Sequence, residues 1–108
     1  MMNVLKDFSV RRGTGERVQA QVEAFVRHFQ EGRYFEAHEV LEEAWRKAEG
    51  QEKRFLQGLI LLAAALHRGK GGVRNLRKAE AKLSGLPSPY LGLDWEPLWQ
   101  EARRRLGA

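Results

Sequence analysis

The sequence contains no cysteine and only three prolines in its 108 residues. Without cysteine the chain forms no disulfide bond, thiolate metal site or cysteine nucleophile, so a zinc ion here would need histidine and carboxylate ligands. The longest unbroken apolar run, residues 59–66, is much shorter than the roughly 20 residues that cross a bilayer. The first residues, MMNVLKDFSVRR, do not resemble a secretory signal, so we expect a cytoplasmic protein without membrane contact.

Acidic residues are scarce over part of the chain. Basic residues outnumber acidic ones 19 to 14, and the segment from Arg68 to Lys82 holds six basic residues and one glutamate. Such a segment suits nucleic-acid contact, but no helical segment interleaves basic residues with aromatic ones that would stack on bases. We therefore expect a solvated, arginine-rich surface that also serves thermal stability, and we do not expect a nucleic-acid partner.

The hydrophobic pattern is helical in almost every part of the chain, and no segment alternates apolar and polar residues as a strand does. Apolar residues recur at intervals of three and four over residues 14–31, 34–48 and 73–86, and a short final helix is predicted from Asp94. Residues 52–68 are apolar on every face, which indicates a helix that the others surround. The prediction is an all-α fold, a small bundle of about five helices around a buried central helix. It forms a single domain over residues 1–108, in which residues 1–13 are a loosely ordered N-terminal arm.

The stretch YFEAHEVLEEAW concentrates a histidine, four glutamates and a tryptophan. On a helix, residues four apart are neighbours, so His38 and Glu42 share a face and Trp45 continues the same row. The other glutamates, Glu39 among them, point toward solvent. A carboxylate beside an imidazole at the edge of a core orients the ring or completes the coordination of a metal ion. A purely structural His–Glu hydrogen bond is an alternative of equal weight.

Counting residues along antiparallel helices places the three histidines near one end of the bundle. The helices over residues 34–48 and 52–68 are joined by a short loop and should run antiparallel. At 1.5 Å per residue, His38 and His67 then stand within about 5 Å of the same level. His28 stands near that level too, but it lies about 100° from the middle of its own apolar stripe.

The same counting sets Trp45 opposite Gln57 and Gly58, where the missing side chain of the glycine would make room for the indole. The predicted site is a divalent-metal site, which would bind zinc, manganese, nickel or iron and needs no organic cofactor. Its ligands are His38, Glu42 and His67, and the residues beside it or lining it are Trp45, Glu39, His28 and Gln57. No catalytic residue is predicted, and whether the protein is an enzyme stays open.

At these residues the chain resembles a family named only as a domain of unknown function, number 309. The family signature is His-x-x-x-Glu-x-x-Trp or Tyr, and here it reads His38, Glu42, Trp45. The resemblance extends through YFEAHEVLEEAW and LQGLILLAAALHRGKGG, roughly from Phe25 to Leu83. It implies an all-helical bacterial or archaeal protein without an established activity, for which metal binding through the signature His and Glu has been suggested. The family's loop usually reads Gly-Asn followed by Gly-Ala, whereas this chain has lysine and valine after the glycines, so no role of an asparagine amide is carried over.

Two further functions stay open. The first is a non-enzymatic protein-interaction or scaffold module with tetratricopeptide-like packing, because EGRYFEAHEVLEEAW resembles half of a tetratricopeptide unit. Its partner, a second copy in a homo-oligomer or another protein, would meet Trp95 and Trp99 of the final helix. Nucleic-acid binding through the basic segment is the weaker third hypothesis.

Overall fold

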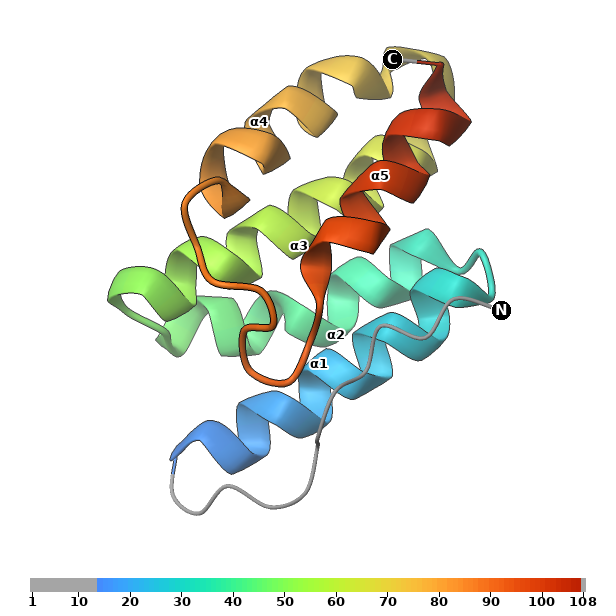
Figure 1. The fold of residues 1–108 in the computed structure, drawn as a ribbon. Coiled ribbons are helices and arrows are strands. Elements are labelled where there is room, and N and C mark those ends of the chain that lie inside the picture. The colour runs from blue at the N-terminus through green and yellow to red at the C-terminus, as the bar shows by residue number, and fades with distance from the viewer. Residues whose placement is uncertain (1–13, 108) are drawn as a thin grey trace.

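The computed structural model describes the fold of residues 14–107 and the side chains of residues 18–107 (Figure 1). This part of the chain is all-helical, as predicted, and its one β-type pairing is an isolated bridge between Tyr90 and Leu93. The expected N-terminal arm, residues 1–13, lies outside the described residues. The helices are α1 (Thr14–Gln30), α2 (Tyr34–Lys47), α3 (Gly50–Arg68), the short 3₁₀ helix η1 (Gly69–Gly72), α4 (Val73–Leu83) and α5 (Trp95–Leu106). None of them combines the length and the hydrophobicity that a membrane crossing requires.

Successive helices pack against one another, α1 on α2, α2 on α3 and α3 on α4. Gly32 lies in the turn between α1 and α2 and Gly50 begins α3, and their φ angles are 78° and 62°. Glycine adopts positive φ without strain, which allows these turns to be tight. Tight turns reverse the chain, so neighbouring helices run antiparallel (Figure 1).

Helix α3 lies in the middle of the bundle, between α2 and α4, and α5 packs across it (Figure 1). Its residues Phe55, Leu59 and Leu62 have no exposed surface. Complete burial of such a side chain stabilises the fold by about 1.5–3 kcal/mol. The prediction of a buried central helix is therefore confirmed.

The structure gives Gly58 a different neighbour from the predicted one. A Cβ atom on Gly58 would lie 2.6 Å from Cγ of Leu83, a fully buried side chain of α4. The prediction that Gly58 makes room for Trp45 is wrong, because the rotation of α3 turns this position toward α4 rather than toward α2. The Trp45 ring instead has Nζ of Lys53 at 4.7 Å from its centroid.

The predicted loop RGKGG folds as the 3₁₀ helix η1, which leads into α4 without a break. Its last residue, Gly72, lies against the backbone of α3, since a Cβ atom on Gly72 would be 2.0 Å from the carbonyl oxygen of Ala65. The same carbonyl accepts the hydrogen bond that the N–H of Gly69 donates at the end of α3. Only a residue without a side chain lets the two backbones approach this closely.

Helix α5 closes the bundle over α3, α4 and η1. Leu98 and Ala102 are fully buried, and the half-buried rings of Trp95 and Trp99 pack against the core. The indole N–H of Trp95 also donates a hydrogen bond to the carbonyl oxygen of Pro87 at 3.0 Å. Both tryptophans thus cap the core of their own chain, and an interface through them stays a prediction.

Candidate functional site

A partly open hollow of about 490 Å³ lies at one end of the bundle, where the start of α2, the end of α3 and the start of α4 meet. Its volume falls in the range of small-molecule sites, about 300–1,000 Å³. The antiparallel arrangement of α2 and α3 brings His38 and His67 to this one hollow. The lining residues are Tyr34, Phe35, His38, Ala64, His67, Arg68 and Asn75.

Phe35 gives the hollow an aromatic wall beside both imidazoles. Its ring centroid lies 6.4 Å from that of His38, with the planes 24° apart, and 5.8 Å from that of His67. Phe35 is 53% exposed and is the one large hydrophobic residue of residues 18–107 that stands open to solvent. Its ring is therefore open to solvent and does not pack into the core.

The imidazole of His38 lines the hollow, and its Nδ1 is buried. This nitrogen makes no hydrogen bond with the described residues. An oxygen of Glu39, Oε2, lies 3.4 Å from this Nδ1, within ion-pair distance but without the geometry of a hydrogen bond. Since the side chain is 29% exposed, the polar ring atom that remains accessible is Nε2.

The polar groups that line the hollow are cationic or neutral. Arg68, Asn75 and Tyr34 join the two histidines in the lining, and none of the seven lining residues is an aspartate or a glutamate. From α5, Nη1 of Arg105 donates a hydrogen bond to the Tyr34 hydroxyl. The hollow therefore presents positive charge and hydrogen-bond donors, which suit an anion better than a cation.

Two of the three predicted metal ligands, His38 and His67, line the hollow. Glu42 is half-buried and does not line the hollow that His38 and His67 share. The hollow is lined by the beginning of α2, and Glu42 lies one turn beyond His38, about 6 Å farther along the helix axis. Within residues 14–107 no group of three or more His, Cys, Asp or Glu side chains is placed to hold one metal ion.

The remaining residues predicted around the site lie in other parts of the bundle. His28 is half-buried in the last turn of α1 and does not line the hollow. Trp45 packs against the core, and its indole N–H is buried without a hydrogen-bond acceptor among the described residues. Gln57 is half-buried on α3 and is also absent from the lining. These three side chains contribute to the bundle rather than to the hollow.

Sequence reasoning missed five lining residues, Tyr34, Phe35, Ala64, Arg68 and Asn75. A signal for two of them was present, because Tyr34 and Phe35 precede His38 by four and three residues and so lie on its face of the helix. Asn75 gave no local signal. It reaches the hollow only because α4 begins against the backbone of α3 at Gly72.

Sequence similarity assigns this helical bundle to a known protein family. The family model described as a domain of unknown function, DUF309, matches residues 22–79. The chain is also similar to the crystal structure of a conserved hypothetical protein from Thermus thermophilus, with 63% sequence identity and a TM-score of 0.76 over 80% of this chain and 95% of that one. No curated protein matches the chain. The chain therefore belongs to the DUF309 family, and the family prediction is confirmed.

Proposed function

We propose that this protein is a binding module whose hollow takes an anionic ligand with a flat, apolar part. The observation that supports it most directly is the lining, in which the open ring of Phe35 stands beside two imidazoles and which includes an arginine but no acidic residue. A flat ring would stack on Phe35. The anionic group would accept hydrogen bonds from Arg68, whose planar fork matches carboxylate and phosphate. Asn75 would orient the ligand, since its carboxamide both donates and accepts hydrogen bonds.

The small number of histidines allows a direct test by NMR, because the chain has only three imidazoles. The probes are uridine monophosphate, benzoate and inorganic phosphate, each titrated into the full-length protein. Uridine monophosphate and benzoate should shift the ring signals of His38 and His67 in a saturable way. Inorganic phosphate, which has no ring to stack, should need a much higher concentration. The signal of His28, outside the hollow, serves as the internal control.

Two exposed side chains supply variants that should keep the fold intact. Phe35→Ala removes the stacking surface and Arg68→Gln removes the charge, and each should weaken the binding of uridine monophosphate about tenfold. Lys47→Gln is the matched control, because it removes one positive charge from the other end of α2, where Lys47 pairs with Glu43. Unmoved signals of the two hollow histidines with every probe, or equal weakening by the lysine and arginine variants, would contradict the proposal.

A divalent metal ion is the second candidate ligand, and the observation in its favour is that His38 and His67 line one hollow. The position of Glu39 near Nδ1 of His38 resembles the carboxylate that often orients a metal-binding histidine. Two imidazoles are one ligand short of the three that proteins supply to typical catalytic zinc sites, so the solvent or a substrate would have to complete the coordination.

The metal candidate is tested by adding zinc, manganese, nickel or iron salts to metal-stripped protein. A ligand at a hundred times its Kd stabilises a fold by about 2.7 kcal/mol, so a binding metal should raise the melting temperature measurably. The rise should disappear in His38→Ala and in His67→Ala. Its persistence in Glu42→Ala would support a site of two histidines, and its loss there would support the predicted site of three ligands. No rise with any of these metals removes the metal candidate.

A further inference from the structure

The excess positive charge of the chain lies in one segment. Residues 68–82 hold six basic residues and one glutamate, a formal charge of +5, which equals the net charge of the whole chain. The other 13 basic and 13 acidic residues cancel. The ion pairs of the described chain lie on α1, on α2, in the turn between them and on α5, and none involves residues 68–82. The basic side chains of this segment are therefore not paired with a described carboxylate, and Glu80 is the one acidic residue within it.

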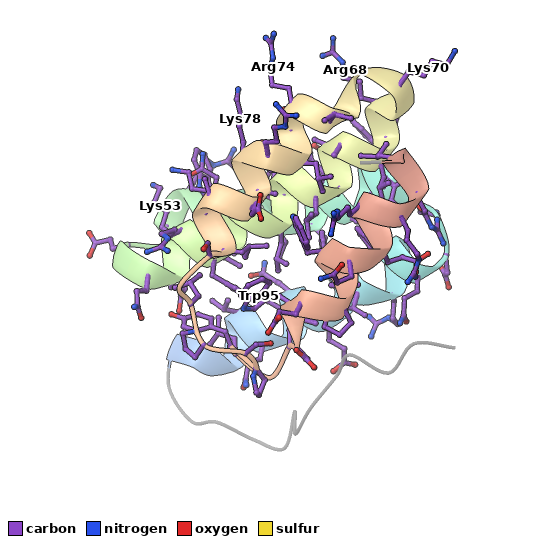
Figure 2. All side chains as sticks on the ribbon, turned by 45° about the horizontal axis from the view of Figure 1, so that its top comes forward. Lys53, Arg68, Lys70, Arg74, Lys78 and Trp95 are labelled. Atoms are coloured by element: carbon purple, nitrogen blue, oxygen red, sulfur yellow. The ribbon has the colours of Figure 1, made fainter. Side chains whose placement is uncertain are left out.

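These cations form a basic ridge along η1 and the outer face of α4. Figure 2 shows Arg68, Lys70, Arg74 and Lys78 projecting from the same side of the bundle, and all four are exposed. Arg74 and Lys78 lie one helical turn apart, and the 11 residues of α4 extend for about 16 Å. The basic ridge comprises Arg68, Lys70, Arg74, Arg77 and Lys78.

The basic ridge and the hollow share one residue, Arg68. Asn75, which lines the hollow, directly follows Arg74 of the ridge. The aromatic wall of the hollow comes from Phe35 on α2, whereas the ridge comes from the end of α3, from η1 and from α4. A polyanion that lies along the ridge therefore reaches an open aromatic ring at the Arg68 end.

We propose that this surface binds single-stranded nucleic acid, with phosphates along the basic ridge and one unpaired base in the hollow against Phe35. This inference rests on the proposed function of the hollow and names its ligand class. Proteins that bind single strands combine a positively charged track with aromatic side chains on which bases stack. A base in a duplex is already stacked and paired, so it does not enter such a hollow without first being extruded.

The sequence argued against a nucleic-acid partner because no helix interleaves cations with aromatic residues. In the folded chain that interleaving occurs between elements, since α2 supplies the ring and α4 supplies the cations. Asn75 also lines the hollow, and a carboxamide matches the donors and acceptors on the edge of a base. A nucleic-acid partner was not expected because no single helix interleaves cations with aromatic residues, and in the folded chain two helices supply them together.

The experiment measures the fluorescence anisotropy of labelled oligomers of about 12 nucleotides with the full chain at several salt concentrations. The oligomers are oligothymidine, an abasic strand with the same number of phosphates, and a duplex. Since one stacked base contributes a substantial part of single-strand affinity, oligothymidine should bind about 5- to 150-fold more tightly than the abasic strand. Phe35→Ala should abolish this advantage and leave the abasic strand unaffected.

Two charge variants distinguish binding to the basic ridge from a general effect of the net charge of the protein. The double variant Arg74→Gln with Lys78→Gln should weaken the binding of both single strands and lower the slope of log K against log salt concentration by about 1.4. The matched control, Arg27→Gln with Lys47→Gln, removes the same charge from α1 and α2 and should leave binding unchanged.

The outcomes distinguish the inference from the proposed function beneath it. Equal binding of oligothymidine and the abasic strand overturns the inference, while a retained response of His38 and His67 to uridine monophosphate leaves the proposed function standing. Tighter binding of the duplex, or equal weakening by the ridge and control variants, also overturns it, because charge alone would then hold the polyanion. If the response to uridine monophosphate is absent as well, both fail.

Discussion

The substitution Gly72→Ala adds one methyl group where η1 meets α3, and we expect it to destabilise the fold strongly. The new Cβ would lie 2.0 Å from the carbonyl oxygen of Ala65, 2.8 Å from its carbonyl carbon and 3.0 Å from its Cα. All three are backbone atoms of α3, which no side-chain rotation moves aside. In a close-packed interior the two backbones would have to separate by about 1 Å to restore ordinary contact distances.

The magnitude follows from three contributions. Overpacking in a core costs about 1–3 kcal/mol and occasionally more. Displacing the Ala65 carbonyl also weakens the hydrogen bond that it accepts from Gly69, which contributes about 0.5–1.5 kcal/mol. The lower entropy of the unfolded chain with alanine offsets about 0.4–1 kcal/mol. We expect a net loss of about 2 kcal/mol and a melting temperature lower by about 8 °C or more.

Urea unfolding followed by far-UV circular dichroism gives the free energy of unfolding that this prediction concerns. Gly71→Ala is the matched control, because neither glycine has a positive φ and the Cβ at position 71 would meet only the side chain of Arg68, with Nε at 2.5 Å. Arg68 is exposed and swings aside, so the control should stay within about 1 kcal/mol of the wild type. Equal stability of the two variants would refute the close approach of η1 to the backbone of α3.

Three further substitutions test the packing and the titration of the core. Gly58→Ala should lower the free energy of unfolding by about 1 kcal/mol, because overpacking against the buried Leu83 outweighs the gain in helix propensity. A variant that is more stable in urea than the wild type would contradict the close contact between position 58 and Leu83. Burial, and to a lesser extent the charge of Glu52, raise the pKa of Tyr90 above its ordinary value of 10.0. The stability that the protonated Tyr90 hydroxyl contributes is fully present below pH 10.0 and is lost as the pH rises through the folded-state pKa. Above pH 10.0 the melting temperature should therefore fall less steeply in Tyr90→Phe than in the wild type. Trp99→Ala should destabilise the fold by about 2–3 kcal/mol without changing the molar mass measured by light scattering, since the indole packs on its own core; a changed mass reveals an interface.

The parts of the fold that depend on helical periodicity were predictable from the sequence. The apolar stripes located the helices, and the segment that is apolar on every face identified α3 as the central one. The common level of His38 and His67 was predictable as well, because the rise per residue is nearly constant in every helix. The position of a residue along its helix axis can therefore be predicted from the sequence.

Rotation about a helix axis was not predictable, because each residue turns the helix by about 100° and small errors change the facing element. Gly58 was expected to face α2 and faces α4 instead. Phe35 lies outside the buried stripe of α2, so periodicity alone classifies it as a surface residue. Its place beside His67 and Arg68 depends on how α3 ends against α2, which no local pattern encodes.

The packing of each helix from α1 to α4 on its successor has a consequence for how the chain folds. Contacts between segments that are close in sequence need little loop closure, and helical proteins of this kind fold within about microseconds to milliseconds. Helix α5 packs on α3 and η1 as well as on its predecessor α4, and its residue Arg105 reaches back to the Tyr34 hydroxyl at the start of α2. This contact joins residues 71 positions apart, so it closes a much longer loop than the contacts between successive helices do.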